Sequence, residues 1–591
     1  MTEARAARGG LAARGASRLF GRLLDLLGRP GRREWAFAAA LGVPFGVSQA
    51  LGWFVARGGE LADLRAGDAA LCAAASLILA ALAAAAFAAL LSRVLRPRAS
   101  VSGSGASRRS ADPRTALGRA LRRMYDRDRL WPRAWLTIAA CWLPACAALF
   151  PGVLAYDPLY ELKWALSDGV TTSFHTLAHS AWLSASVAFG RDAFGSAEAG
   201  LALYTVAQVL LLSGALACCV AALRRFGAPF WSQMLALAWF SLFPAHAVLA
   251  MTATKDVAFT AFLVLSVVLS CEAARDPKRF FARARGPLAL AGALLLMFAF
   301  RKNALYAFIA AGPFLVAACP GARGRAAGLC AACLAVGVLY FGPVHGALCD
   351  EDAPTVPPAG STEALSVPLQ QLARAMVREG EGLGAETFAA AESYVPAWRS
   401  YDERIADPLK FGSGNRRVEE DPAGFLSVWA QVGALRPAVY ADAWLSLSHG
   451  FWYLDFRYSD FSQGRPYLEW RSVPREAISD GDADAFVYIG QTGPAALRET
   501  VGRFMDRMPW DSVPVLSWLF NPGLFAWVLI ASATSCLYLR RYRLAAALAL
   551  PLAYLATCLL GPTLLIRYAY PLFALAPFAL GMPFVREGGP L

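Results

Sequence analysis

The sequence predicts an all-α polytopic membrane protein of about twelve transmembrane helices. Three observations lead to this fold class. The 591-residue chain is 57% hydrophobic and only 17% charged, with a mean hydropathy of +0.43. Uncharged runs of about 20 residues, long enough to cross a bilayer as helices, recur along it. Arg-rich segments alternate with acidic ones, so the net charge of +13 indicates membrane topology rather than nucleic-acid binding.

The apolar runs place the expected spans. They lie near residues 34–56, 69–92, 134–152, 199–222, 230–250, 256–273, 286–300, 303–319, 326–344, 520–538, 543–560 and 567–584. The stretch "FRKNA" interrupts the apolar region 286–319, which we therefore divide into two spans.

The distribution of charge predicts the orientation of these spans. Residues 1–33 hold eight Arg against two acidic residues, and residues 93–133 hold twelve Arg against three Asp. Both segments are expected in the cytoplasm, because cytoplasmic loops collect Lys and Arg. Residues 345–519 carry 25 acidic against 15 basic residues, as expected for the opposite side. Both termini are then cytoplasmic, and the protein is a multi-pass protein of the cell membrane.

The predicted domain organisation follows this topology. In order along the chain we expect a cytoplasmic basic arm with an interfacial helix (1–33), two accessory transmembrane helices (34–92), a cytoplasmic Arg-rich linker (93–133), a transmembrane core (134–344) with a first extracytoplasmic loop (153–198), an extracytoplasmic domain (345–519), and C-terminal transmembrane helices with a short cytoplasmic tail (520–591). Helical spacing of Phe425, Trp429, Val432 and Leu435 predicts that the extracytoplasmic domain is mainly helical.

Charged and polar residues gather at the outer ends of the spans. All five His and four of the five Lys fall there, in a chain that otherwise uses Arg. The candidate residues are Asp157, Glu161, His175 and His179 in the first outer loop, Lys255 and Asp256 at a second turn, Arg301 and Lys302 at a third, and Arg567 and Tyr568 at the last. Because charge at a span centre costs about 2.5 to 3.5 kcal/mol, such a cluster indicates a site. Lys and Arg that reach toward lipid headgroups are the structural alternative.

This residue set favours chemistry on a phosphate-linked lipid. Cations surround an anionic headgroup, and a nearby carboxylate accepts a proton from an attacking hydroxyl. We therefore expect Asp157 to be the general base, with the other candidates binding substrate. No Gly-rich phosphate loop or metalloprotease motif is present, and no cofactor is expected, a divalent cation being the open alternative.

The build resembles the GT-C superfamily of membrane glycosyltransferases, which includes protein O-mannosyltransferases and aminoarabinose transferases. The resemblance covers most of residues 132–584 and rests on "FPGVLAYDPLYE", "FHTLAHSAWLSASVAFG" and "TKDVAFTAFLVL". "ALSVPLQQLARA" and "IRYAYPLF" are also similar to segments of uncharacterised bacterial membrane proteins of the same build. The resemblance implies a polyprenyl-phosphate-linked sugar as donor and an envelope glycan, lipid or protein as acceptor.

Three alternatives stay open at this point. They are a polymerase or ligase of lipid-linked glycans, a transporter or flippase, and a non-catalytic protein of envelope assembly. The site hypothesis itself makes a geometric prediction, namely that Asp157 lies within about 20 Å of Lys255, Arg301, Lys302 or Arg567, a separation over which one lipid headgroup can contact both sides.

Overall fold

The computed structural model describes residues 30–95, 119, 125, 129–172, 174–350, 364–410, 414–461, 464–478 and 483–585. Over these residues the protein is mostly helical, and β structure is limited to isolated bridges. The expected all-α class is confirmed. Most of the expected basic arm and of the Arg-rich linker lies outside the described residues.

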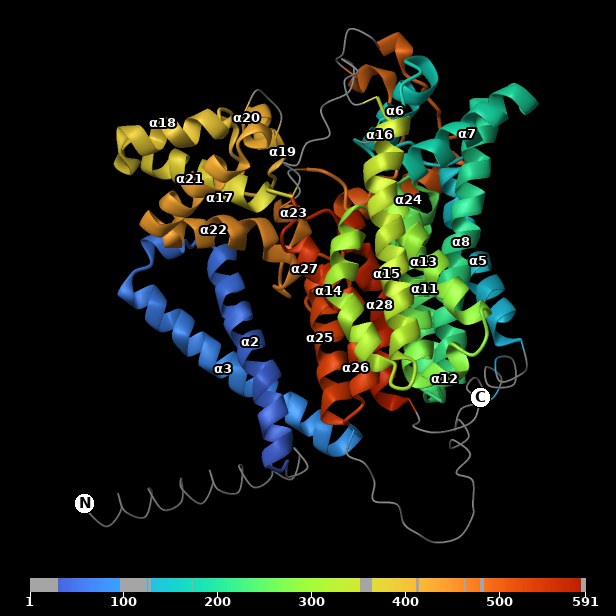
Figure 1. Ribbon diagram of the computed structural model, residues 1–591, viewed down its shortest axis with the longest axis horizontal. Coiled ribbons are helices and arrows are strands. Elements are labelled where there is room, and N and C mark those ends of the chain that lie inside the picture. Colours follow the sequence, from blue (N-terminus) through green and yellow to red (C-terminus); the bar gives the residue numbers. More distant parts are fainter. Residues whose placement is uncertain are drawn as a thin grey trace.

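The α-helices are named as in Figure 1. They are α2 (Arg32–Ala56), α3 (Ala66–Leu90), α5 (Leu130–Leu149), α6 (Tyr156–Leu162), α7 (Leu177–Phe194), α8 (Ala197–Arg225), α9 (Phe230–Leu242), α10 (Pro244–Met251), α11 (Lys255–Arg275), α12 (Pro277–Phe280), α13 (Arg285–Phe300), α14 (Asn303–Ala318), α15 (Arg323–Leu339), α16 (His345–Leu348), α17 (Ser366–Glu379), α18 (Ala385–Tyr394), α19 (Asp407–Lys410), α20 (Gly414–Glu420), α21 (Pro422–Leu435), α22 (Pro437–Ser448), α23 (Tyr458–Phe461), α24 (Ala495–Arg507), α25 (Pro522–Tyr538), α26 (Tyr542–Ala547), α27 (Ala549–Cys558) and α28 (Ile566–Gly581).

Several helices of the described chain are long and apolar enough to cross a membrane. Five meet this description by themselves, namely Arg32–Ala56, Ala66–Leu95, Ala197–Arg225, Lys255–Arg275 and Arg323–Leu348. The pair α9 and α10, bent by 49° at Phe243, makes a sixth if it is one span. Other expected spans are shorter apolar helices, such as α13 and α14 with 16 residues each. Length and composition thus support five or six spans directly, fewer than the expected twelve.

Helices α2 and α3 form a hairpin at the side of the main bundle in Figure 1, and Phe45 of α2 packs against Trp527 of α25. Gly42 and Gly46 of α2 face Ala84 and Ala80 of α3 so closely that an added Cβ would lie 2.6 and 2.2 Å from their backbone nitrogens. Small residues four apart let two membrane helices approach in this way. The opposite side of α3 is apolar and exposed, with Leu82 at 63%, which suits contact with lipid.

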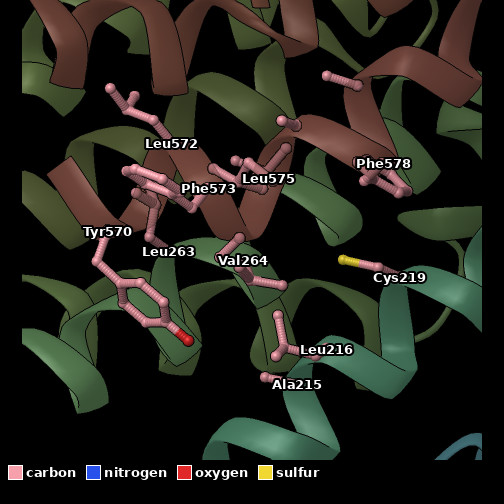
Figure 2. Packing of buried hydrophobic residues seen from close by; sticks show 14 of the residues in the cluster. Ala215, Leu216, Cys219, Leu263, Val264, Tyr570, Leu572, Phe573, Leu575 and Phe578 are labelled. Atoms are coloured by element: carbon pink, nitrogen blue, oxygen red, sulfur yellow. The ribbon is translucent and has the colours of Figure 1, made fainter. Parts of the chain in front are cut away.

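The core of the main bundle is built around α28. Figure 2 shows Tyr570 and Phe573 of α28 close to Val264 of α11 and Leu216 of α8, and all four side chains are buried. Burial of such large apolar side chains holds the helices in register, so the ends of α8, α11 and α28 have defined relative positions.

The region after α16 contains a separate helical unit. Its core includes Leu369 and Leu372 of α17 with Phe425 and Val432 of α21. The expected helical spacing is confirmed in part, because Phe425 and Val432 are fully buried whereas Leu435 is 49% exposed. Tyr467 and Trp510 instead lie in the core of the main bundle. Phe486 belongs to a third cluster, which includes residues of α6 and α7. The described part of the predicted extracytoplasmic segment 345–519 is therefore divided among three hydrophobic clusters.

Candidate functional site

Two extended segments bring the start of α6 next to the start of α11. The Val153 N–H donates to the Met251 carbonyl at 2.8 Å, and the Ala253 N–H donates to the Val153 carbonyl at 2.9 Å, which makes a short parallel bridge between Val153 and Thr252. Helix α6 begins three residues after Val153, and α11 begins three residues after Thr252. The bridge therefore sets Asp157 beside Lys255 and Asp256.

Two arginines enter the same region from other helices. Arg301 lies between α13 and α14, and Arg567 is the second residue of α28. The Arg301 guanidinium donates to the Tyr554 hydroxyl at 3.0 Å, and that hydroxyl donates to the Tyr568 carbonyl at 2.7 Å. Arg301 also lies over the Tyr568 ring, 4.3 Å from its centroid. These contacts fix Arg301 relative to the start of α28.

Ion pairs join the arginines to two aspartates. Arg567 Nη2 lies 2.7 Å from Asp157 Oδ2, and Arg567 Nε lies 3.8 Å from Asp256 Oδ2. Arg301 Nε lies 3.1 Å from Asp256 Oδ1. The predicted convergence of Asp157 with Arg567 is present. The four side chains form a chain of alternating charge that we call the ion-pair chain, in the order Asp157, Arg567, Asp256, Arg301.

The two aspartates of the ion-pair chain differ in exposure. The Asp256 side chain is 1% exposed, whereas that of Asp157 is 27% exposed. Burial by itself raises the pKa of Asp157, but the charges of Arg567 and Lys255 nearby hold it well below its usual range. Asp157 is consequently ionised throughout the neutral range and accessible to a ligand.

Lys255 has a neutral partner. Its ammonium lies 3.2 Å from His175 Nδ1, and because an ammonium only donates, that ring nitrogen accepts. Burial, and then the Lys255 charge, lower the pKa of His175 to about 4, so the imidazole is neutral at pH 7. Within the described residues Lys255 makes no ion pair. Its positive charge is therefore not offset by a directly contacting carboxylate.

Glu161 and His179, also predicted as site residues, belong to an internal hydrogen-bond network. Glu161 Oε2 accepts from His179 Nδ1 at 2.7 Å and from Ser180 Oγ at 2.5 Å. His179 Nε2 lies 2.9 Å from the Tyr204 hydroxyl, which donates to Gln208 Oε1 at 2.9 Å. His179 is fully buried. We call this set the Glu161 network.

The Glu161 network connects α6 to the segment before α11. Gln208 Nε2 donates to the carbonyls of Ala250 and Thr252 at 3.0 and 2.8 Å, so its Oε1 is the acceptor for Tyr204. The Tyr204 oxygen is then left to accept from His179 Nε2–H. On its other side His179 Nδ1 lies 2.7 Å from the Glu161 carboxylate. Burial opposes ionisation of Glu161, but the contact with His179 lowers the pKa of Glu161 to about 2.

Two further predicted residues lie at the edge of the ion-pair chain. Tyr568 is partly exposed, and its ring centroid lies 5.4 Å from the Arg567 guanidinium carbon. Lys302 is exposed and immediately precedes α14. Lys302 is thus a second cation, directly after Arg301 in the chain.

Sequence reasoning missed Glu469. Its backbone carbonyl accepts a hydrogen bond from Thr252 Oγ1 at 3.2 Å. Burial of the surrounding loop raises the pKa of Glu469, with Arg567 opposing and Asp157 adding to the rise. Glu469 therefore lies in the same electrostatic environment as the ion-pair chain. It occurs in an irregular loop without periodicity, and no sequence signal points to it.

The arrangement as a whole is suited to anion binding. The N-terminal ends of α11, α14 and α28 carry Lys255, Arg301 and Arg567 at or beside their first turns. Helix N-termini and cations both favour a bound anion such as phosphate. In the described part of the chain, no group of three or more His, Cys, Asp or Glu side chains is placed to hold a metal ion.

Comparison with known proteins identifies a family. A family of unknown function, DUF6020, matches residues 164–588. The chain belongs to the DUF6020 family. No curated protein and no solved structure gives a match to this chain. The DUF6020 match includes His175, Lys255, Arg301 and Arg567, and it begins after Asp157 and Glu161.

Proposed function

We propose that this DUF6020 protein is a membrane glycosyltransferase that transfers a sugar from a polyprenyl-phosphate donor to an acceptor hydroxyl at the outer face of the membrane. The observation that carries the proposal is the ion-pair chain beside Lys255. Arg567 and Lys255 supply cations for a phosphate, and the 27% exposed Asp157 supplies a proton acceptor 2.7 Å from Arg567. Cations and a carboxylate at such short range suit transfer from a phosphate-linked group.

The proposed reaction uses these groups in defined roles. The acceptor oxygen forms a bond to the anomeric carbon of the sugar, and the bond from that carbon to the phosphate oxygen breaks. The electron pair leaves on the phosphate, whose growing charge Arg567 and Lys255 offset. The hydroxyl proton moves to the Asp157 carboxylate. The products are the glycosylated acceptor and polyprenyl phosphate.

The proposed topology has twelve spans with both termini in the cytoplasm. It is supported by helices at every expected span, although several are shorter than a full crossing. The basic helix α12 lies at the opposite end of the bundle from α6 in Figure 1, in line with the positive-inside distribution of charge. In this topology the ion-pair chain faces the outer leaflet, where lipid-linked donors are accessible. A GT-C-like build is part of the same proposal.

The test is a transfer assay with wild-type protein purified into lipid nanodiscs. A panel of polyprenyl-phosphate sugars is offered, and release of polyprenyl phosphate and labelling of envelope acceptors are measured. Transfer from at least one donor, lost in Asp157→Asn, is the expected result. Wild-type protein that is inert toward the whole panel contradicts the proposal. So does labelling of Cys349 only after a membrane-impermeant maleimide is admitted to the cytoplasm.

A transporter or flippase is the second candidate, and the break between α9 and α10 favours it. The two helices bend by 49° at Phe243, and discontinuous helices are common at transporter binding sites. The surroundings of this break differ from those of a transporter binding site, however. His246 of α10 is fully buried and its Nδ1 lies 2.8 Å from the Tyr570 hydroxyl inside the apolar core. Movement of labelled lipid across liposomes without sugar transfer would favour the transporter.

A further inference from the structure

Asp157 is a weak proton acceptor as the structure holds it. Its carboxylate is ion-paired with Arg567, and the pKa of Asp157 lies well below its usual range. A general base acts best when its pKa is close to the working pH. A base in this position therefore needs an event that removes Arg567 from it.

The structure makes Asp157 the exchangeable partner of Arg567. Asp256 is held by Arg301 at 3.1 Å and by the Thr254 hydroxyl at 3.1 Å, and it is 1% exposed. Among the described residues Asp157 makes its ion pair with Arg567 and with no other side chain, and it is 27% exposed. Arg567 is itself 16% exposed, so an anion from outside can reach it. Replacing Asp157 on Arg567 requires only rotation of one partly exposed side chain.

We propose that the phosphate of the donor takes the place of Asp157 on Arg567, so that the base is released only when donor is bound. This inference rests on the proposed function and adds an order of binding to it. Phosphate accepts two hydrogen bonds from one guanidinium, and Lys255 provides a second cation beside it. The displaced Asp157 carboxylate then faces the acceptor without a guanidinium partner.

The exchange also accounts for release of the product. After transfer, Asp157 carries the acceptor's proton and is neutral, so it does not compete with polyprenyl phosphate for Arg567. When Asp157 loses that proton to water, its carboxylate again competes for the guanidinium, and the phosphate leaves. Donor therefore binds before the base is available, and deprotonation promotes departure of the spent lipid.

The experiment measures equilibrium binding of polyprenyl monophosphate to purified protein in nanodiscs, without any transfer step. Wild type is compared with Asp157→Asn, which keeps the side-chain shape but removes the competing charge. We expect Asp157→Asn to bind the lipid phosphate roughly 5- to 20-fold more tightly, the scale of one partly exposed charge-assisted contact. Polyprenol, which lacks the phosphate, is the ligand control and shows no such difference.

Two further variants separate exchange from simple loss of negative charge. Glu469→Gln removes a nearby carboxylate that is not ion-paired with Arg567 and is expected to change affinity by less than about threefold. Asp256→Asn removes the carboxylate that orients both arginines and is expected to weaken binding roughly tenfold. Opposite effects of Asp157→Asn and Asp256→Asn distinguish exchange from a general electrostatic effect.

Equal or weaker binding in Asp157→Asn overturns the exchange, as does equal tightening in all three variants or a wild-type protein that binds no phosphate. Tighter binding of both inorganic phosphate and lipid phosphate by Asp157→Asn locates the exchange at the phosphate group. Tightening toward the lipid alone supports a lipid-anchored ligand. If the tightening occurs but no donor supports transfer, the exchange stands and the proposed function fails.

Discussion

Asp157 and Glu161 lie one turn apart on α6, and the structure gives them opposite environments. Glu161 is 3% exposed and accepts hydrogen bonds from two side chains of α7, one of which continues to Tyr204 and Gln208. Asp157 is 27% exposed and has Arg567 as its partner. A carboxylate that accepts its hydrogen bonds from buried side chains holds helices together, whereas one with a single, partly exposed partner can exchange it for a ligand.

The largest expected effect is that of Asp157→Asn on transfer. Removing the proton acceptor is expected to lower the transfer rate by a factor of roughly 10² to 10⁴, with little change in melting temperature. The measurement is sugar transfer from the active donor by purified protein. Asp168→Asn is the matched control, because Asp168 is a carboxylate of the same loop that pairs with Lys163 instead. Full transfer in Asp157→Asn would show that Asp157 is not the base.

Glu161→Gln is expected to act on stability rather than on chemistry. The substitution removes the buried carboxylate that accepts hydrogen bonds from His179 and Ser180, at a cost of about 1 to 3 kcal/mol. Thermal unfolding in detergent measures the change, with Asp484→Asn in an exposed ion pair as the control. Transfer per folded molecule is expected to fall far less than in Asp157→Asn. An unchanged melting temperature would show that the Glu161 network does not stabilise the fold.

The same variant has a defined dependence on pH. The pKa of Glu161 is lowered from its ordinary value of 4.5 to about 2 in the folded protein. The stabilisation from the carboxylate is therefore complete above about pH 4.5 and is lost as the pH falls toward 2. The difference in melting temperature between wild type and Glu161→Gln should accordingly shrink below pH 4.5.

Tyr204→Phe is expected to have the smallest effect of the three. It removes the hydroxyl that joins His179 to Gln208 and leaves two buried polar groups with one partner fewer, at a cost of about 1 to 2 kcal/mol. Tyr156→Phe, whose hydroxyl donates to Tyr160 at an exposed position, is the control and should be neutral. A loss of stability as large as that of Glu161→Gln would mean that all hydrogen bonds of the Glu161 network stabilise the fold together, rather than mainly the contact between Glu161 and His179.

Much of the helical architecture follows from the sequence. The span expected at 199–222 is α8, Ala197–Arg225, and that expected at 256–273 is α11, Lys255–Arg275. The span expected at 230–250 is divided at Phe243, because Pro244 lacks the N–H that would continue the helix. The broken helix could have been anticipated from that proline.

The residues of the site were partly foreseeable. That Asp157, Asp256, Arg301 and Arg567 lie together at helix ends was expected from the sequence, since charge is excluded from the apolar runs. Gln208, in contrast, was overlooked although a polar side chain inside a predicted span is itself a signal of an internal partner. Glu469 gave no signal at all.

The helical class, the approximate helix positions and the placement of charged residues at helix ends follow from the sequence, because each depends on local hydrophobicity and charge along the chain. The pairing of the charged side chains with one another depends on the tertiary structure. Arg567 is 410 residues from Asp157 along the chain, and their 2.7 Å contact depends on how α28 packs against α11 and on the bridge between Val153 and Thr252. The tertiary structure likewise decided that Glu161 turns inward and Asp157 outward, because burial at one helical turn depends on neighbours that are distant in sequence.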